Sequence, residues 1–133
     1  MTRVLALDHG TARCGCAVSD PSRTLATPLP VVERPDSKRG LAALARLVAD
    51  QGAELVVVGL PLTLRGEEGE QAAAAREFAE RLEQRVGVPV ELHDERLTTR
   101  LAERADGREE ADSRAAAHLL ESYLARASAG SSR

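Results

Sequence analysis

Aromatic residues are almost missing from this chain of 133 residues, which contains Phe78 and Tyr123 but no tryptophan. A core without large rings must be built from Leu, Val and Ala, and few rings are left for nucleic-acid bases to stack on. Lysine occurs once, as Lys38, and the formal net charge is −3, so the composition does not indicate a general nucleic-acid coat protein. An enzyme that needs only a local basic patch is not excluded.

Cysteines and long apolar runs are also scarce. Cys14 and Cys16 lack the second ligand pair that a structural zinc site requires, so we expect buried free thiols. No apolar run reaches the roughly 20 residues that span a bilayer, and we expect no signal peptide. The sequence therefore predicts a cytoplasmic protein that does not contact membranes.

The remaining composition is that of a folded domain, with 43% apolar and 29% charged residues. We expect one domain over residues 1–127, followed by a disordered tail over residues 128–133. Short apolar runs predict strands, and longer amphipathic stretches predict helices. The strands are expected at 3–7, 13–19, 24–33, 54–59 and 88–93, and the helices at 37–51, 70–86, 98–105 and 112–127.

This order of elements predicts an α/β fold with a five-stranded mixed sheet flanked by helices. The first three strands should form an antiparallel meander, and the helix-linked strands should run parallel through right-handed crossovers. The first, fourth and fifth strands would then end at the same edge of the sheet. Ligands of open α/β sheets bind at that edge, and acidic residues follow two of the three strands.

Each acidic position also has an ordinary structural interpretation. Asp8 precedes a glycine turn and fits a turn residue, Asp94 or Glu95 could cap a following helix, and Asp112 is a good N-cap for the last helix. Adjacent side chains at a strand end point in opposite directions, so only one of the 94–95 pair need face a site. We favour Glu95 as the ligand and keep Asp94 as the alternate ligand.

Three converging carboxylates would suit hard divalent cations, Mg²⁺ or Mn²⁺, which prefer oxygen ligands. Two such ions about 4 Å apart can activate water and stabilise the leaving oxygen of a phosphodiester. Nearby, Arg96, Arg100 and Arg104 form a stripe that could bind phosphates or could be a solvated helix face paired with acidic neighbours. His9 and His93 are expected near this site and could contact phosphate or assist proton transfer.

One further pattern is the segment Asp8–Thr11 followed by Cys16–Val18, which is similar to the phosphate-binding hairpin of actin-like ATPases and sugar kinases. Those ATPases close two lobes on the nucleotide, and a chain of 133 residues supplies only one.

Four sequence blocks carry a family resemblance: LALDHGTARCGCAVSDP, VVVGLPL with Gly66 and Gly69, DERLTT, and DSRAAAHLLESYL. In this order they resemble the YqgF (RuvX) family, whose members are similar to Holliday-junction resolvases of the RuvC type. The resemblance implies a ribonuclease H-like fold and a metal-dependent nuclease. It also implies an acidic triad of Asp8, Glu95 and Asp112 as both catalytic and metal-binding residues, with Asp8 bridging two ions.

The activity implied is hydrolysis of a phosphodiester by metal-activated water, which leaves a 5′-phosphate and a 3′-hydroxyl. The substrate implied is the 5′ end of the pre-16S rRNA during ribosome biogenesis, with the pre-ribosomal particle as a partner. The alternatives are a Holliday junction resolvase acting on branched DNA, and a non-catalytic RNA-binding ribosome-assembly factor. The chain would act as a monomer or a homodimer. The residues expected to bind substrate are Gly10, Thr11, Arg13, Leu60, Pro61, Arg96, Thr98, Thr99 and Arg100.

The sequence departs from the family pattern between Arg100 and Ala111. Family members usually carry a longer, lysine-rich stretch there, whereas this stretch holds no lysine and includes Glu103, Asp106 and Glu109. The departure leaves the acidic triad intact but predicts weaker binding of the substrate or a different choice of substrate.

Overall fold

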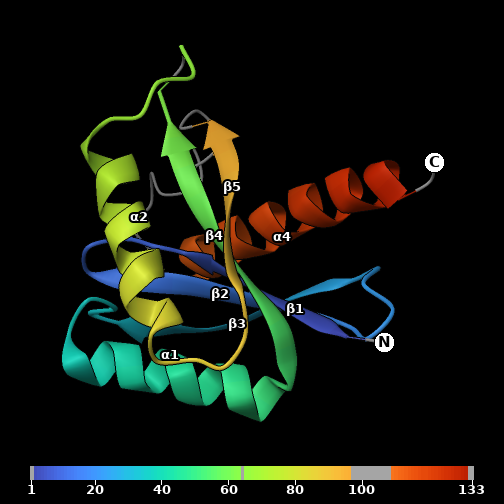
Figure 1. Ribbon diagram of the computed structural model, residues 1–133, viewed down its shortest axis with the longest axis horizontal. Coiled ribbons are helices and arrows are strands. Elements are labelled where there is room, and N and C mark those ends of the chain that lie inside the picture. The colour runs from blue at the N-terminus through green and yellow to red at the C-terminus, as the bar shows by residue number, and fades with distance from the viewer. Residues whose placement is uncertain (1, 64, 97–108, 132–133) are drawn as a thin grey trace.

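A computed structural model describes residues 2–63, 65–96 and 109–131 of the chain (Figure 1). Within them, five strands and three helices alternate after an opening meander, as predicted. The helix expected at 98–105 lies outside the described residues. The elements, in chain order, are β1 Arg3–Asp8, β2 Arg13–Ser19, β3 Ala26–Glu33, α1 Lys38–Gln51, β4 Ala53–Leu62, α2 Glu70–Glu83, β5 Val90–Arg96 and α4 Glu109–Ser131.

The strands form one mixed sheet in the order β3-β2-β1-β4-β5. β1 pairs antiparallel with β2, and β2 pairs antiparallel with β3. β1 pairs parallel with β4, and β4 pairs parallel with β5. The predicted five-stranded mixed sheet is therefore confirmed, and β1, β4 and β5 end at the same edge.

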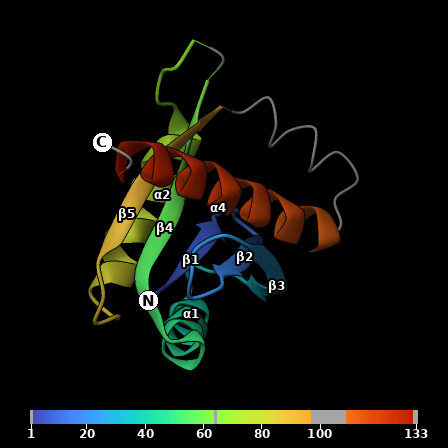
Figure 2. The same ribbon diagram turned by 90° about the vertical axis from the view of Figure 1, so that its right-hand side faces the viewer.

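Helices cover both faces of this sheet. α1 and α2 lie over one face, and α4 crosses the other, as Figure 2 shows. Side-chain alternation along β1 explains the division, because successive residues of a strand point to opposite faces. Leu5 and Leu7 pack with the α1 and α2 core, whereas Val4 and Ala6 pack with α4. A strand buried on both faces is apolar throughout, which is why the four residues from Val4 to Leu7 are all apolar.

The predicted cap of α1 is present. The Ser37 side chain accepts a hydrogen bond from the backbone N–H of Gly40 at 2.9 Å, so one of the unsatisfied donors of the first turn is satisfied. The helix ends at Gly52, which adopts a left-handed conformation with φ of 64°. This turn leads directly into β4.

β4 is longer than predicted, because Leu60, Pro61 and Leu62 continue the strand instead of forming a loop. β1 pairs with β4 only as far as Val58, and beyond that residue β4 pairs with β5 alone. Proline lacks an N–H and is tolerated in a strand where one side has no partner strand. The end of β4 is such a position, so the proline does not terminate the strand.

Boundaries of other elements also differ from the prediction. β5 continues through Arg96, so Asp94 and Glu95 lie within the strand and not after it. α2 ends at Glu83 and does not reach residue 86. α4 begins at Glu109, one turn earlier than predicted, and continues through residues 128–131, which were expected to belong to the tail.

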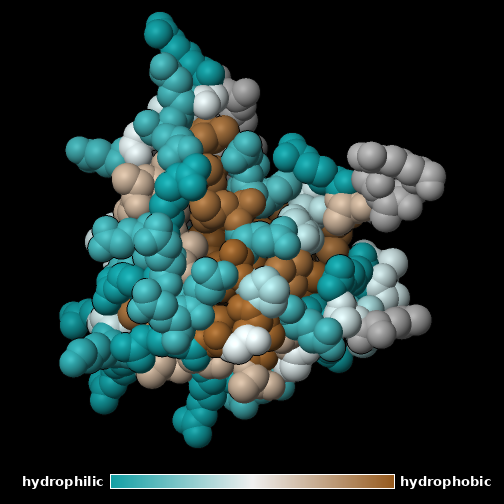
Figure 3. Space-filling view, viewed as in Figure 1, coloured by the Kyte–Doolittle hydropathy of each residue, from teal (hydrophilic) through white to brown (hydrophobic). Residues whose placement is uncertain are grey.

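In the described ranges, we find no helix with the length and apolar character needed to cross a membrane. Hydrophilic side chains cover α1 and α2 on the face shown in Figure 3, and apolar side chains come to the surface in a central band. Cys14 and Cys16 are buried free thiols in the core, as predicted.

Candidate active site

Asp8 lies at the end of β1 and is completely buried. It has the same strand parity as Val4 and Ala6, which pack with α4. The alternation of side chains along a strand therefore directs the Asp8 carboxylate toward the face that α4 covers. A carboxylate buried in this way needs hydrogen-bond donors or a nearby cation, because burying an uncompensated carboxylate costs several kcal/mol or more.

Gly15 brings the second acidic residue to Asp8. Gly15 is the cross-strand partner of Asp8 in the antiparallel β1–β2 pair, so the two Cα atoms lie about 5 Å apart. A Cβ atom built on Gly15 would collide with the backbone carbonyl oxygen of Asp112. Cross-strand partners share a face of the sheet, so the backbone of Asp112 passes over the face that Asp8 occupies. Positions 8 and 112 therefore lie close together on this face of the sheet.

Asp112 lies in the first turn of α4 and is 4% exposed. Because the helix begins at Glu109, Asp112 is not its N-cap, and the alternative interpretation of this residue as a cap is wrong. Its Oδ2 atom lies 2.8 Å from Nε of Arg13, the first residue of β2. The neighbouring Ser113 hydroxyl donates to the Leu29 carbonyl at 2.7 Å, which ties the start of α4 to β3.

The third acidic position lies on the parallel side of the sheet. Glu95 pairs in register with Pro61 near the end of β5, at the edge where β1 also ends. Position 95 has the strand parity of Glu91 and His93, and both of these residues contact α4: Glu91 accepts from Tyr123 at 3.4 Å, and His93 lies 3.0 Å from the Ser122 hydroxyl. The Glu95 side chain lies outside the described part of the structure.

Asp94 occupies the opposite parity, and its side chain is exposed. It pairs in register with Leu60, which belongs to the core beneath α1 and α2. Its charge contributes to raising the pKa of Arg76 on α2, after the larger contribution of Glu68. Asp94 thus lies on the face away from Asp8 and Asp112.

The residues expected to bind substrate fall into three groups. Gly10 is partly buried and Thr11 is exposed in the β1–β2 turn, and Arg13 contacts Asp112 as described. Leu60 and Pro61 are buried, so Leu60 could reach a ligand only through its backbone. The remaining predictions fall outside the described residues or side chains: Arg96, Thr98, Thr99 and Arg100.

The two histidines near this edge have structural partners. His9 stacks on Phe78 with ring centroids 4.6 Å apart, and its Nε2 lies 2.7 Å from Oδ2 of Asp36. Phe78 belongs to the core beneath α1 and α2, so His9 points away from the acidic pair. Burial and the charge of Arg126 lower the pKa of His93, which favours a neutral ring at neutral pH.

The donor chemistry of Asp8 and Asp112 fits a hard divalent cation. Both donors are carboxylates, they come from different elements, and Oδ1 of Asp8 and Oδ2 of Asp112 are shut off from solvent. Within the described ranges, no three histidine, cysteine or acidic side chains form a metal-binding group. A third protein ligand would have to come from a side chain outside them, and position 95 is the acidic candidate at the same edge.

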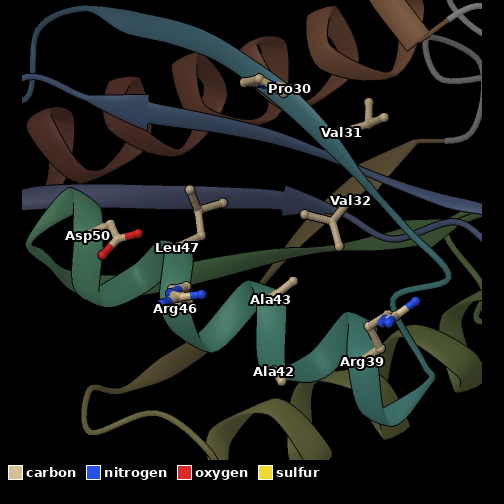
Figure 4. Close-up of a pocket in the computed structure, with 9 residues that line it drawn as sticks. All are labelled: Pro30, Val31, Val32, Arg39, Ala42, Ala43, Arg46, Leu47 and Asp50. Atoms are coloured by element: carbon tan, nitrogen blue, oxygen red, sulfur yellow. The ribbon is translucent and has the colours of Figure 1, made fainter.

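A separate cavity of about 480 Å³ lies between β3 and α1 (Figure 4). Its lining is mainly apolar, with Arg39 and Arg46 on the helix side and Asp50 at one end. Neither Asp8 nor Asp112 contributes to it, so it is not the acidic site.

Comparison with known proteins shows matches along most of the chain. The family model described as "RuvX: Holliday junction resolvase" matches residues 2–126. A protein of Chloroflexus aggregans named "Putative pre-16S rRNA nuclease" is 43% identical over 130 residues, covering 91% of this chain and 92% of that protein. A protein of Moorella thermoacetica with the same name is 43% identical over 133 residues, covering 93% and 95%.

Among solved structures, RuvC of Thermus thermophilus in complex with a Holliday junction substrate has a TM-score of 0.57 and 20% sequence identity. The match covers 96% of this chain and 97% of that chain. At this identity the likeness concerns the fold, and it supports the predicted ribonuclease H-like architecture.

Proposed function

Because this chain belongs to the RuvX family of Holliday junction resolvases, we propose that it is a metal-dependent nuclease that hydrolyses phosphodiester bonds in the 5′-end processing of pre-16S rRNA. The relatives named for that processing are about 40% identical and match over nearly their whole length. The proposal includes action in the cytoplasm, where the chain would meet the pre-ribosomal particle.

One observation carries the catalytic part of this proposal: the fully buried Asp8 shares its face of the sheet with the backbone of Asp112, which passes over Gly15. Two carboxylates at one edge of the sheet supply the oxygen ligands that hard divalent cations prefer. Strand ends in open α/β sheets are the usual location of ligands. A buried acidic pair at that edge supports a cation site better than it supports a purely structural role.

The protein's own contribution would be to hold and orient charge. Asp8 and Asp112 would hold Mg²⁺ or Mn²⁺ together with Glu95, and two ions are expected. When bound, divalent ions supply an activated water for in-line attack and charge stabilisation for the leaving oxygen. The burial of Asp8 and Asp112 keeps bulk water away from the carboxylates, which strengthens their interaction with a cation. Arg96 and the exposed Thr11 would contact the phosphates beside the bond that is cut.

Branched DNA is the second candidate substrate, because the family itself is described as a Holliday junction resolvase. A four-way junction has two-fold symmetry, so junction cleavage would require a homodimer, whereas trimming of an RNA end would not. Sedimentation in the presence of each substrate distinguishes these two modes of action.

The decisive experiment is a cleavage assay with Mg²⁺ or Mn²⁺ on a pre-16S rRNA fragment with an extended 5′ end and on a four-way DNA junction. We expect the wild-type protein to cleave the RNA and to leave a 5′-phosphate. Cleavage should cease when EDTA removes the divalent ions. Asp8→Asn should be inactive. Asp50→Asn is the matched control, because Asp50 is an exposed acidic residue of α1 outside the site.

Cleavage of the junction in preference to the RNA would replace the rRNA proposal with the resolvase alternative. RNA binding without any cleavage, equal in wild type and Asp8→Asn, would support the non-catalytic assembly factor. Cleavage that persists in Asp8→Asn would contradict the proposed site.

A further inference from the structure

The ion pair between Arg13 and Asp112 joins a partly exposed cation to a buried carboxylate. Nε of Arg13 lies 2.8 Å from Oδ2 of Asp112, and the two side chains are 32% and 6% exposed. Arg13 also has the strand parity of Gly15 and Ala17, and Ala17 packs in the core beneath α4. Arg13 therefore lies on the same face as Asp8 and Asp112, at the solvent side of the pair.

A buried carboxylate needs compensating charge or hydrogen bonds, and Asp8 and Asp112 are both buried in this site. Arginine is suited to compensate this charge because its guanidinium does not lose its proton in proteins. In the absence of a divalent ion, Arg13 thus supplies a positive charge at Asp112. The ion pair also holds Oδ2 on the side of the guanidinium.

The same oxygen is one that a divalent ion would use. A cation coordinated by Asp112 would sit within a few ångströms of the guanidinium, and two positive charges at that distance repel strongly in a buried site. The partial exposure of Arg13 leaves room for its side chain to turn outward. The ion and the guanidinium therefore compete for Asp112.

We propose that Arg13 is a displaceable counter-cation, which holds Asp112 in place until a divalent ion binds and then releases Oδ2. The inference rests on the proposed function in one respect, namely that the competing ligand is a divalent ion bound by Asp8 and Asp112. Once released, the guanidinium is at the solvent side of the site. A phosphodiester is its natural ligand there, because the planar guanidinium matches phosphate oxygens. Arg13 is thus a positioning residue for the acidic pair that becomes a substrate contact.

The test measures Mn²⁺ binding by isothermal titration calorimetry and by electron paramagnetic resonance of free Mn²⁺, without any nucleic acid. Removing the competing charge in Arg13→Gln should tighten Mn²⁺ binding about tenfold. The same variant should melt at a lower temperature than wild type without metal and should gain more thermal stability from Mn²⁺. Arg13→Lys retains the charge and should bind Mn²⁺ nearly as wild type does.

Arg46→Gln is the matched control, because it removes an arginine charge from the exposed face of α1 and should leave Mn²⁺ affinity unchanged. A merely structural ion pair predicts lower stability with equal or weaker Mn²⁺ binding in Arg13→Gln, and that result would overturn the inference. If the glutamine variant does not fold, Arg13→Met, which keeps the length of the side chain, is read in the same way.

The two proposals fail differently. If wild type binds no Mn²⁺, or if Asp8→Asn binds it as well as wild type does, the proposed metal site is wrong. The proposed role of Arg13 is then overturned as well. If wild type binds Mn²⁺ through Asp8 but Arg13→Gln binds it no more tightly, only the role of Arg13 is overturned.

Discussion

The backbone of Asp112 rests directly on Gly15, at a place where any side chain on the sheet would collide with the Asp112 carbonyl oxygen. Because Gly15 is the cross-strand partner of Asp8, this contact sets how closely the first turn of α4 approaches the end of β1. The glycine is thus a spacer between sheet and helix, and the separation of the two acidic residues depends on it.

Gly15→Ala should therefore damage both stability and metal binding. The added methyl group must push α4 away from the sheet, and overpacking of this kind costs about 1–3 kcal/mol. Urea unfolding should show this loss, and Mn²⁺ affinity should fall because Asp112 moves away from Asp8. Gly87→Ala is the control, since a Cβ atom there meets nothing within 4 Å. If Gly15→Ala lost stability but bound Mn²⁺ normally, the acidic pair would not depend on this contact.

The neighbouring acidic residues of β5 should differ sharply in their effect on activity. Position 95 has the parity of the α4 face, whereas Asp94 is exposed on the other face and interacts with Arg76. Glu95→Gln should lower the cleavage rate by roughly a hundredfold or more, as expected for a direct metal ligand. Asp94→Asn should stay within a few-fold of wild type. Cleavage rates measured at saturating Mn²⁺ check this prediction. If Asp94→Asn lost more activity than Glu95→Gln, Asp94 and not Glu95 would be the metal ligand.

Stability should depend on the ionisation of Asp20 in the β2–β3 turn. Backbone N–H groups of Leu25 and Thr24 and the Ser22 hydroxyl hydrogen-bond its carboxylate, and they hold its pKa well below the usual value of 3.8. A carboxyl group whose pKa is lower in the folded state stabilises the fold above its unfolded pKa. That stabilisation is lost as the pH falls below about 4 toward the folded pKa.

The check compares urea unfolding of wild type and Asp20→Asn between pH 6 and pH 2.5. The wild type should lose more stability than the variant over the acidic part of this range, because asparagine does not titrate. Asp50→Asn, on the exposed face of α1, serves as the control for removing a carboxylate. Parallel pH profiles for wild type and Asp20→Asn would mean that the turn does not hold the ionised carboxylate more tightly than the unfolded chain does.

Local sequence patterns were sufficient to predict the strands and the common edge at which β1, β4 and β5 end. The bounds of β2, the Ser37 cap and the parallel run of β1, β4 and β5 follow from alternation, capping chemistry and crossover rules. These features depend on neighbouring residues in the chain. The end of β4 was predicted wrongly because a proline such as Pro61 usually marks the end of a strand. Only the sheet pairing reveals that β4 no longer has β1 as a neighbour at this point.

The contacts that shape the acidic site could not be predicted in the same way. Asp112 fits the local pattern of an N-cap, and the start of α4 one turn earlier is set by its packing on β2 and β3. The contact of Gly15 with Asp112 and the ion pair of Arg13 join residues about a hundred positions apart. One signal was available, a glycine between two cysteines in an otherwise buried strand, which often marks the close approach of another backbone.

Phe78 should support the site from the opposite face of the sheet. Its ring is fully buried and stacks on His9, which follows Asp8 directly and also pairs with Asp36. Phe78→Leu keeps most of the core volume and should cost about 1–1.5 kcal/mol of unfolding free energy. It removes the flat surface against which the His9 ring is held, so the end of β1 should loosen and Mn²⁺ affinity at Asp8 should fall.

Leu82→Met is the matched control, because Leu82 is equally buried one turn further along α2. A volume-conserving change there should cost a similar amount of stability without touching His9, so its Mn²⁺ affinity should remain that of wild type. Urea unfolding and Mn²⁺ titration of both variants distinguish a general loss of core stability from the loss of the stacking between Phe78 and His9. Equal Mn²⁺ affinities in the two variants would mean that the end of β1 is held by its pairing with β2 and β4 alone, because both substitutions lie in α2 and not in these strands.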